Sequence, residues 1–252
     1  MNNKTDKIEF ISEIGLNHNG SFNLAKKLIK QSKEIKCDFV KFQIRNIKEM
    51  YHPYFLKNFS NSENANQYIY NEIKKTNINK SKYIKLFKFA KKINLKVMIT
   101  PFDLKSLDLC KRKEVDAIKI GSPDFNNLQL IIKALKFKKP LFISTGMATD
   151  NEINIMKSFL KKYNTYNVQI TIFHCVSSYP PNEDEMNIRY ISNLVKKFPD
   201  YRIGYSGHER GFLPSLISIF FGSKVIERHI TLDKKSKGPD HNASLVKTEF
   251  RE

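Results

Sequence analysis

The stretch from Gly204 to His241, GYSGHERGFLPSLISIFFGSKVIERHITLDKKSKGPDH, has the pattern of a strand, a helix, a second strand and a loop. His208 and His229 each stand at the end of a predicted strand. An apolar helix of about 12 residues lies between the strands, which is the length of one step in a βα barrel. Consecutive parallel strands of a barrel end at the same face. The two histidines can therefore meet over one pocket, although 21 positions separate them.

Two histidines at one pocket allow two interpretations. Neutral imidazoles with open positions left for water and substrate suit a catalytic divalent metal. In the alternative, one histidine is packed in the core and the other caps a helix. The spacing alone leaves both interpretations open, and the rest of the chain has to decide between them.

The alternation of strand and helix runs along the whole chain. Apolar runs predict eight strands, over residues 8–14, 39–43, 96–100, 117–120, 141–144, 168–175, 201–206 and 225–229. Seven helices are predicted between them, including one capped by Ser21, one capped by Asp103 and one that begins with a capping box of Thr149 and Glu152. The count predicts an α/β fold, a TIM (β/α)8 barrel, as a single domain over residues 1–252.

Two segments depart from this alternation. Residues 44 to about 80 are polar, aromatic and rich in Asn, which predicts a long insert-like loop that acts as a lid or a mobile segment. The eighth helix would begin near Thr248, but the chain stops at Glu252. We therefore expect a barrel that is truncated at its last helix.

Composition narrows the classes of function. With 40% hydrophobic residues the chain can bury a sizeable core, and its three well-separated cysteines suit a reducing cytoplasm. Residues 1–10 show no secretory signal, and the longest apolar stretch, residues 212–222, is too short to span a bilayer. We therefore expect a cytoplasmic protein that does not associate with membranes.

The net charge of +19 raises the question of nucleic-acid binding. Only seven of the 44 basic residues are Arg, the lysines are spread along helix faces, and no nucleic-acid-binding motif occurs. We therefore expect no nucleic-acid partner. The positive potential can instead attract an anionic substrate.

In a βα barrel, the side chains at the carboxyl ends of the strands line the active site. These positions and the loops after them carry Glu13, Lys41, Gln43, Thr100, Lys119, Ser122, Asp124, Ser144, Ser177, Tyr179, Ser206, His208, His229, Asp240 and His241. Lysines and hydroxyls suit phosphate and carboxylate oxygens, the histidine pair can hold a metal, and carboxylates can move a proton.

Some of these residues have a structural alternative. Lys41 and Lys119 lie within apolar strands, where a lysine is costly unless it faces a pocket or a partner, so we favour a function for both. Taken singly, Thr100 and Ser144 fit helix caps better than ligands. Glu13 fits an ordinary strand-end carboxylate as well as it fits a functional group.

A few other residues receive a structural interpretation. His174 fits a satisfied core histidine, and the run from Tyr179 to Pro181 fits a rigid turn. His18 and His52 lie in predicted loops and receive no role.

Nine motifs connect these positions to a known family. EIGLNHNGS, DFVKFQ, TPFD, IKIGSPDFNN, STGM, HCVSSYP, GYSGHE, ERHITLD and GPDH occur in this order between Glu13 and His241. The chain resembles the N-acetylneuraminate (sialic acid) synthase family, including its relatives that make legionaminic and pseudaminic acids. The resemblance runs from about Ile8 to the end. No single motif is decisive, but the ordered set is highly specific.

The resemblance implies a condensation reaction. Phosphoenolpyruvate (PEP) adds through C3 to the aldehyde of an open-chain N-acetylated hexosamine such as N-acetylmannosamine. Water attacks C2, phosphate leaves through C–O cleavage, and a nine-carbon 2-keto sugar acid results. In the family a divalent metal, Mn²⁺ or Mg²⁺, polarises the aldehyde. The matching metal ligands here are His208 and His229, which must be neutral, so activity should fall as the pH drops below roughly 6 to 6.5.

The resemblance also assigns the remaining positions. Lys41, Thr100 and Ser122 match the grip on the PEP phosphate, and Lys119, Ser144 and Ser206 match the grip on its carboxylate. Glu13 matches the acid at the reacting centre, and Asp124, Tyr179 and Asp240 match positions that contact the sugar. Gln43 and Ser177 complete the predicted substrate site.

The chain departs from the family pattern at several points. Ser177 stands where many members carry an amide or another small residue, Asp124 stands where Glu is common, and Gly207 replaces an Asp of many bacterial members. Members usually continue into a small antifreeze-protein-like domain, which supplies an arginine to the partner subunit in a domain-swapped homodimer. We expect that domain to be absent here.

These departures leave alternatives open. One is a truncated barrel that is inactive alone and acts only with a separate C-terminal domain or a partner subunit. Another is a metal-dependent aldolase-like barrel with a different keto acid donor. The acceptor also stays open among N-acetylmannosamine, its 6-phosphate and the diacetamido-hexoses.

Overall fold

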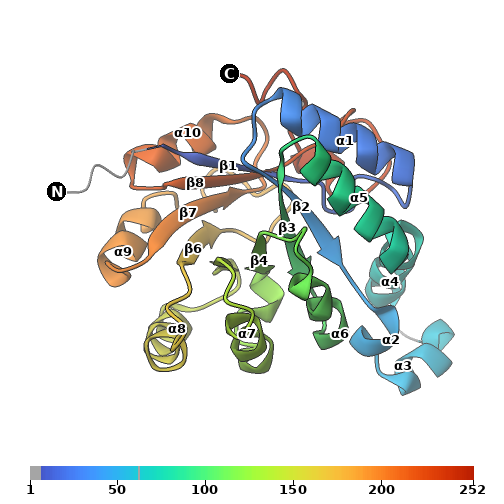
Figure 1. Cartoon of the computed structure of the whole chain (residues 1–252), viewed down its shortest axis with the longest axis horizontal. Helices are drawn as coiled ribbons and strands as arrows, with labels where there is room; N and C mark the ends of the chain where they lie inside the picture. The colour runs from blue at the N-terminus through green and yellow to red at the C-terminus, as the bar shows by residue number, and fades with distance from the viewer. Residues whose placement is uncertain (1–6, 62) are drawn as a thin grey trace.

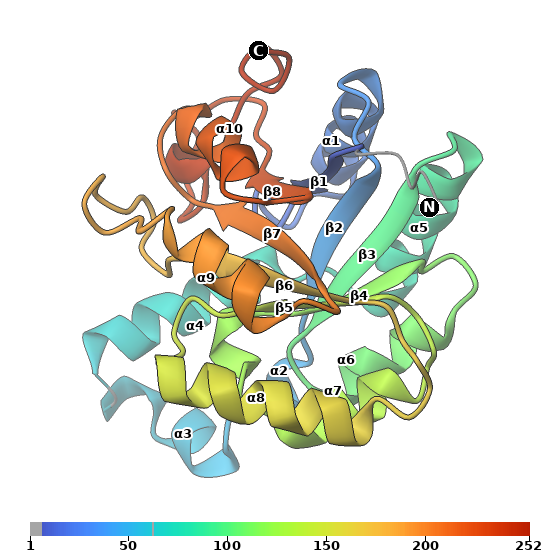
Figure 2. The ribbon, with the colours of Figure 1, turned by 90° about the vertical axis from the view of Figure 1, so that its left-hand side faces the viewer.

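The computed structural model describes residues 7–61 and 63–252, and its centre is a closed barrel of eight parallel strands in sequential order. The strands are β1 (Glu9–Glu13), β2 (Phe39–Ile44), β3 (Lys96–Pro101), β4 (Ala117–Ile120), β5 (Leu141–Ser144), β6 (Ile170–Cys175), β7 (Arg202–Gly207) and β8 (Val225–His229). Figures 1 and 2 show the helices ringed around them. The predicted TIM-barrel class is confirmed.

The α-helices are α1 (Phe22–Glu34), α2 (Ile47–Met50), α3 (Pro53–Lys57), α4 (Asn64–Thr76), α5 (Lys80–Lys92), α6 (Leu104–Leu107), α7 (Leu128–Leu135), α8 (Asp150–Tyr163), α9 (Tyr190–Lys197) and α10 (Leu213–Phe220). Among the described residues, four short 3₁₀ helices accompany them, η1 (Phe59–Asn61), η2 (Asp108–Lys111), η3 (Ser122–Asp124) and η4 (His241–Ala243). The predicted caps at Ser21, Asp103 and Thr149 are observed, the last with its full capping box.

The interior of the barrel has two layers, because alternate residues of each strand face inward. The lower layer is an apolar cluster of Ile11, Phe39, Met98, Ala117, Phe142, Phe173 and Val225. Two residues further along these strands stand Glu13, Lys41, Thr100, Lys119, Ser144, Cys175 and Glu227. The lower layer thus closes the barrel, and the upper layer places polar side chains at its carboxyl end.

Gly204 of β7 is required by this packing. A Cβ at this position would lie 2.4 Å from a ring carbon of Phe173. The absence of a side chain on β7 therefore makes room for a large aromatic ring from β6. A second, larger apolar cluster fills the space between the strands and the surrounding helices.

The segment after β2 differs from the prediction of a long loop. It folds as α2, α3, η1 and α4, and Figure 1 shows α2 and α3 at the edge of the helix ring. Four aromatic residues, Tyr51, Phe55, Phe59 and Tyr70, pack together with ring centroids 4.8 to 5.9 Å apart. The segment has a small core of its own, which the Asn-rich composition concealed.

Smaller differences concern α10 and the end of the chain. Helix α10 has eight residues instead of about 12. After β8 the chain forms η4, a bridge between Ile230 and Leu245 and a turn over residues 247–251, where the sequence predicts a helix start. Residues 1–6, part of the segment in which we found no secretory signal, and Ser62 of the predicted loop lie outside the described residues.

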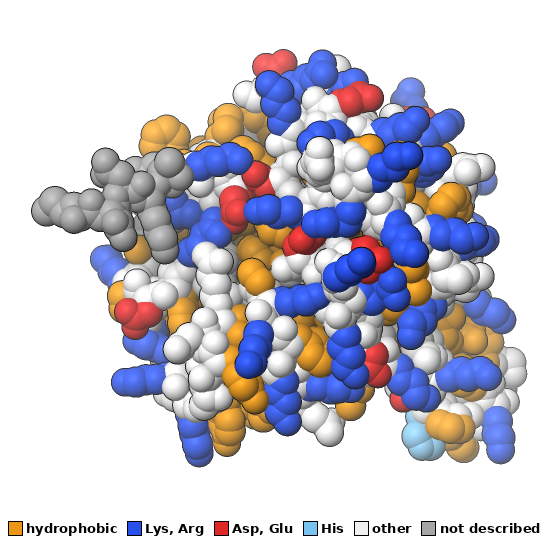
Figure 3. Space-filling view, viewed as in Figure 1, with side chains coloured by type: hydrophobic (Ala, Val, Ile, Leu, Met, Phe, Trp, Pro, Cys, Tyr) orange, Lys and Arg blue, Asp and Glu red, His pale blue; other side chains and the backbone are white. Residues whose placement is uncertain are grey.

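The surface agrees with the interpretation of scattered charge. On the face drawn in Figure 3, Lys and Arg side chains are interspersed with polar, apolar and acidic ones. None of the helices over residues 7–61 and 63–252 combines the length and apolar composition that crossing a bilayer requires. The three cysteines are buried free thiols.

His18 gives the fold a pH dependence that can be measured. It is fully buried, its Nδ1 accepts a hydrogen bond from the Gly20 N–H, and its ring packs edge-on against Tyr83. Burial, with a smaller effect of the Arg45 charge, lowers the pKa of His18 from 6.5 to about 4. Below pH 6.5 the unfolded chain therefore binds a proton that the folded chain does not. The free energy of unfolding consequently decreases as the pH decreases.

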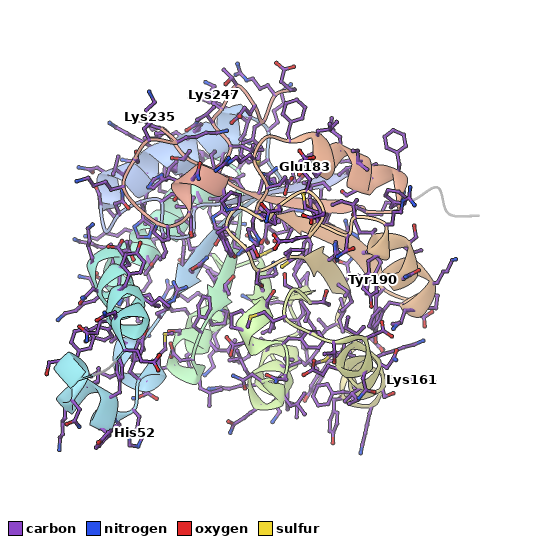
Figure 4. The ribbon with its side chains drawn as sticks, turned by 180° about the vertical axis from the view of Figure 1, so that it is seen from behind. His52, Lys161, Glu183, Tyr190, Lys235 and Lys247 are labelled. Atoms are coloured by element: carbon purple, nitrogen blue, oxygen red, sulfur yellow. The ribbon has the colours of Figure 1, made fainter. Side chains whose placement is uncertain are left out.

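Between pH 6.5 and 4 we expect the free energy of unfolding to decrease less in His18→Asn than in wild type, by up to roughly 3 kcal/mol, because the variant lacks this buried histidine. The measurement is urea denaturation across this range. The matched control is His52→Asn, at an exposed cap residue that Figure 4 places at the periphery. Parallel pH profiles for wild type and His18→Asn would contradict the assignment.

Candidate active site

The carboxyl end of the barrel encloses a cavity of about 340 Å³. Thirteen of the predicted site residues line it, namely Glu13, Lys41, Gln43, Thr100, Lys119, Ser122, Ser144, Ser177, Tyr179, Ser206, His208, His229 and Asp240. Asp124 is not among the lining residues. It lies in η3 and accepts a hydrogen bond from Asn127. The fold thus brings together side chains that are up to 227 positions apart in the sequence.

Four buried charges of alternating sign cross the floor of this cavity. Lys41 Nζ lies 3.0 Å from Glu13 Oε2 and 3.5 Å from Glu227 Oε1. Lys119 Nζ donates to both oxygens of Glu227, at 2.9 and 3.0 Å. The chain of charges runs from β1 through β2 to β8 and across the lumen to β4. The two lysines therefore face partners, as their place within apolar strands required.

Hydroxyl groups complete this charge chain. Lys41 Nζ also donates to Thr100 Oγ1 at 3.0 Å, and Ser206 Oγ donates to Glu227 Oε1 at 3.0 Å. Burial alone would raise the pKa of Glu227, but the two lysines hold it at about 2. Burial opposes the charge on Lys41, yet its two carboxylates outweigh burial and raise its pKa. For Lys119, burial and the neighbouring Lys41 outweigh Glu227 and lower the pKa.

His208 and His229 face each other as predicted, with ring centroids 5.4 Å apart. His208 Nδ1 lies 2.8 Å from the Val176 carbonyl oxygen, which only accepts, so Nδ1 carries the proton and Nε2 keeps its lone pair. His229 Nδ1 has no hydrogen-bond partner in the described structure and lies 3.5 Å from Asp240 Oδ2. The Tyr179 ring packs on the His208 ring, with ring centroids 4.0 Å apart.

The expected loss of activity below pH 6 to 6.5 assumed ordinary histidines. Burial, assisted by His229, lowers the pKa of His208 from 6.5 to about 3. His208 therefore stays neutral through the range in which we expected protonation. The sequence-based pH argument is wrong for this residue, because it could not include the cost of charging an enclosed ring.

Gly15, the second residue after β1, lies where three of the predicted site residues converge. A Cβ there would lie 3.1 Å from Asp240 Oδ2, 3.1 Å from His229 Cε1 and 3.2 Å from Glu13 Oε1. The residue also has a φ of +50°, which favours glycine. A side chain at this position would crowd the acid, the histidine and Asp240 at once.

The structure tests the purely structural interpretations of Thr100, Ser144 and His174. Asp103 and Thr149 cap the helices that follow β3 and β5, so the capping interpretation of Thr100 and Ser144 is wrong. His174 is a satisfied core histidine, with Nε2 donating to the Met186 carbonyl at 2.8 Å. Ser122 Oγ accepts from the Gly146 N–H and lies 3.2 Å from Cys175 Sγ.

Sequence reasoning missed Glu227, Arg45 and Cys175 in the cavity lining. Period-two alternation was the available signal for Glu227, because it stands two residues before His229 on β8 and faces the same way. The same alternation applies to Arg45, two residues after Gln43. Its guanidinium donates to Gln43 Oε1, and Gln43 in turn donates to Glu13.

A buried ion pair outside the barrel wall links the two histidines. Arg228 Nη1 lies 2.7 Å from Glu209 Oε1, and Arg228 also donates to the Glu209 and Gly211 carbonyls. Glu209 follows His208, and Arg228 precedes His229. Both charged side chains are almost fully buried. The pair therefore ties the segment that carries one histidine to the strand that carries the other.

A closed parallel barrel that gathers lysines, acids and neutral histidines in one cavity belongs to the class of barrel enzymes that act at the carboxyl ends of their strands. Comparison with known proteins identifies the family. Residues 28–252 match the model of the NeuB family. The chain belongs to this family, the sialic acid synthase family. The predicted enzyme class, a PEP-dependent transferase that forms C–C bonds, is confirmed by this membership.

Individual relatives agree with the assignment. The chain is 38% identical over 251 residues to N,N'-diacetyllegionaminic acid synthase of Campylobacter jejuni, covering 97% of this chain and 74% of the relative. It is 36% identical to N-acetylneuraminate-9-phosphate synthase of Drosophila melanogaster, covering 98% of this chain and 66% of the relative. The crystal structure of N-acetylneuraminic acid synthetase from Leptospira borgpetersenii, in complex with citrate, superposes with a TM-score of 0.85 at 31% identity, covering 97% of this chain and 80% of that one.

We expect Arg228→Met to lower the free energy of unfolding by about 3–5 kcal/mol, because it leaves Glu209 buried without its cation. The double variant Arg228→Met/Glu209→Gln should recover part of this loss, since it removes both charges. Urea denaturation measures both effects. Lys247→Met, which removes an exposed ion pair with Glu34, is the control and should cost less than about 1 kcal/mol. A similarly small loss in Arg228→Met would show that the buried pair is not important for stability.

Proposed function

We propose that this chain condenses PEP with the aldehyde of an open-chain N-acetylated hexosamine, giving a nine-carbon 2-keto sugar acid and inorganic phosphate. The observation that carries the proposal is the cavity floor, where Lys41 and Lys119 lie among hydroxyls and line the same cavity as the histidine pair. Cationic and hydroxyl donors suit the two anionic ends of PEP. The family membership supports the same reaction class.

The residues divide the substrate between two ends of the cavity. Lys41 with Thr100 and Ser122 faces the PEP phosphate, and Lys119 with Ser144 and Ser206 faces the PEP carboxylate. The acceptor sugar lies between Gln43, Ser177, Tyr179 and Asp240. Fixed donors on rigid strands hold PEP C3 against the aldehyde carbon, which removes most of the orientational entropy of the encounter.

The proposed steps conserve atoms and electrons. The electron pair of the PEP C2–C3 double bond forms the new bond to the aldehyde carbon, and the aldehyde oxygen gains a proton. Water then adds at C2, the bond between C2 and the phosphate oxygen breaks, and the C2 oxygen from water becomes the keto group after losing its protons. Glu13, held by Lys41 and Gln43 at the end of β1, is positioned to move one of these protons.

The histidine pair fits a divalent metal as a two-ligand site with open positions. His208 keeps Nε2 free, and His229 Nδ1 lacks a hydrogen-bond partner among the described residues. No group of three His, Cys, Asp or Glu side chains in metal-binding arrangement occurs in the described part of the chain. Mn²⁺ or Mg²⁺ bound to the pair would stabilise negative charge that develops on the aldehyde oxygen.

The test is phosphate release from PEP with N-acetylmannosamine, its 6-phosphate or a diacetamido-hexose, each with Mn²⁺. We expect release that needs both PEP and a sugar, and a loss on the order of 100-fold or more in His208→Ala and His229→Ala. A chelator should abolish the release, and added Mn²⁺ should restore it. His52→Ala, at the exposed cap, is the matched control.

Two results would contradict the proposal. Release without sugar would indicate hydrolysis instead of condensation. Full activity in both histidine variants would remove the role of the pair. Activity that appears only when a separate C-terminal domain is added would instead support the alternative of a barrel that works with a partner.

A further inference from the structure

A second cavity, of about 520 Å³, adjoins the active site. The segment after β2, the connection between α4 and α5, and the α6–η2 region enclose it. Its lining consists of residues 44–48, 77–80 and 83 together with residues 105, 106, 108 and 109. Arg45 lines both this cavity and the active site, so it marks the junction between them. We call this second space the side cavity.

The side cavity carries an excess of positive charge. Four basic residues line it, Arg45, Lys48, Lys80 and Lys105, against one acid, Asp108. Asp108 is already paired, with Lys111 at 2.9 Å and with Lys133 at 3.5 Å.

One of the four basic residues, Lys105, pairs with a carboxylate, that of Glu49. Within residues 7–61 and 63–252, no carboxylate lies within ion-pair distance of Arg45, Lys48 or Lys80. Three basic side chains therefore line one cavity with no carboxylate of the described residues within ion-pair distance, Arg45 partly buried and Lys48 and Lys80 exposed.

Arg45 is the informative member of this set. Its guanidinium carbon lies 3.9 Å from the centre of the Phe102 ring, and it donates a hydrogen bond to the neutral amide oxygen of Gln43. A largely enclosed cation is costly unless an anion compensates it. Burial lowers the pKa of Arg45, and the nearby Tyr83, Asp240 and Glu13 only partly offset this effect. The planar guanidinium presents paired donors that match a phosphate group.

The position of Arg45 couples the side cavity to catalysis. Arg45 donates to Gln43 Oε1, and Gln43 Nε2 donates to Glu13 Oε1 at 2.8 Å. A ligand that draws Arg45 toward the side cavity therefore acts on the hydrogen bond that orients Glu13. The first turn of α5, with Lys80, also borders the cavity and adds the favourable field of a helix N-terminus.

We propose that the side cavity is a phosphate-binding subsite, in which Lys48 and Lys80 hold a phosphate dianion and Arg45 contacts it from the junction. The phosphate can come from two sources, a phosphate ester on the distal end of the acceptor sugar or free inorganic phosphate. The first source rests on the proposed function, and the second does not. The subsite itself is defined by the three basic residues that have no carboxylate within ion-pair distance among the described residues.

The first test is binding of inorganic phosphate to the full chain by titration calorimetry at constant ionic strength. We expect Lys48→Gln/Lys80→Gln to weaken binding about tenfold or more. The control is Lys27→Gln/Lys30→Gln, which removes the same charge from exposed positions on α1 and should change the affinity less than about twofold. Equal weakening in both double variants, or unchanged affinity in Lys48→Gln/Lys80→Gln, would overturn the proposal. This readout needs no turnover, so it is independent of the proposed reaction.

Kinetics with PEP then distinguish the sources. If the acceptor carries the phosphate, Lys48→Gln/Lys80→Gln should raise KM for an N-acetylhexosamine 6-phosphate about tenfold. KM for the unphosphorylated sugar and kcat should stay unchanged. If free phosphate is the ligand, both KM values should stay unchanged and product inhibition by phosphate should weaken. A drop in kcat alone, with unchanged KM and inhibition, would contradict both.

Discussion

The structure depends on one interaction, the buried chain of charges from Glu13 through Lys41 and Glu227 to Lys119. Each charged side chain would be very costly to bury alone in the barrel lumen, because a charged group loses most of its hydration when it moves from water into an enclosed interior. Together they alternate in sign and satisfy one another. Lys119 on β4 and Glu227 on β8 also connect opposite walls of the barrel. The same contacts that make the site chemically useful therefore help to fix its shape.

The apolar layer beneath explains why this arrangement is rigid. Phe173 belongs to the apolar layer beneath the charges. Its ring centroid lies 4.4 Å from the Lys119 ammonium nitrogen, and its ring stacks on Phe142. Because side chains alternate along a strand, an apolar residue in the lower layer places the residue two positions later in the upper one. Each strand thus supplies both a piece of the barrel core and a piece of the site. The location of the active site follows from the fold, and its chemistry follows from which residues occupy the upper layer.

This logic explains what could be predicted from the sequence. The strands of buried residues, such as AIKI at 117–120 and LFIS at 141–144, were predicted to the residue because these short apolar runs are bounded by Asp116 and Gly121 and by Pro140 and Ser144. Glu227 was missed because the reading of β8 stopped at its terminal histidine. The helices after β2 were missed because their stability comes from an aromatic cluster between residues 51 and 70, which composition alone does not reveal. The low pKa of His208 required knowledge of the enclosure around it.

The charged side chains that line the cavity nearly balance one another. Three basic residues, Lys41, Lys119 and Arg45, line the cavity together with three acids, Glu13, Glu227 and Asp240. A floor that is neutral overall cannot hold a multiply charged anion by the field of its lysines alone, because each lysine already shares its charge with a carboxylate. Additional positive charge must come from beyond the two lysines. Among the described residues, Arg45 is the one basic residue of this lining with no carboxylate within ion-pair distance, although Asp240 and Glu13 raise its pKa. It lies where the candidate site adjoins the side cavity. In the proposed reaction, anion recognition therefore involves the segment after β2 as well as the strands.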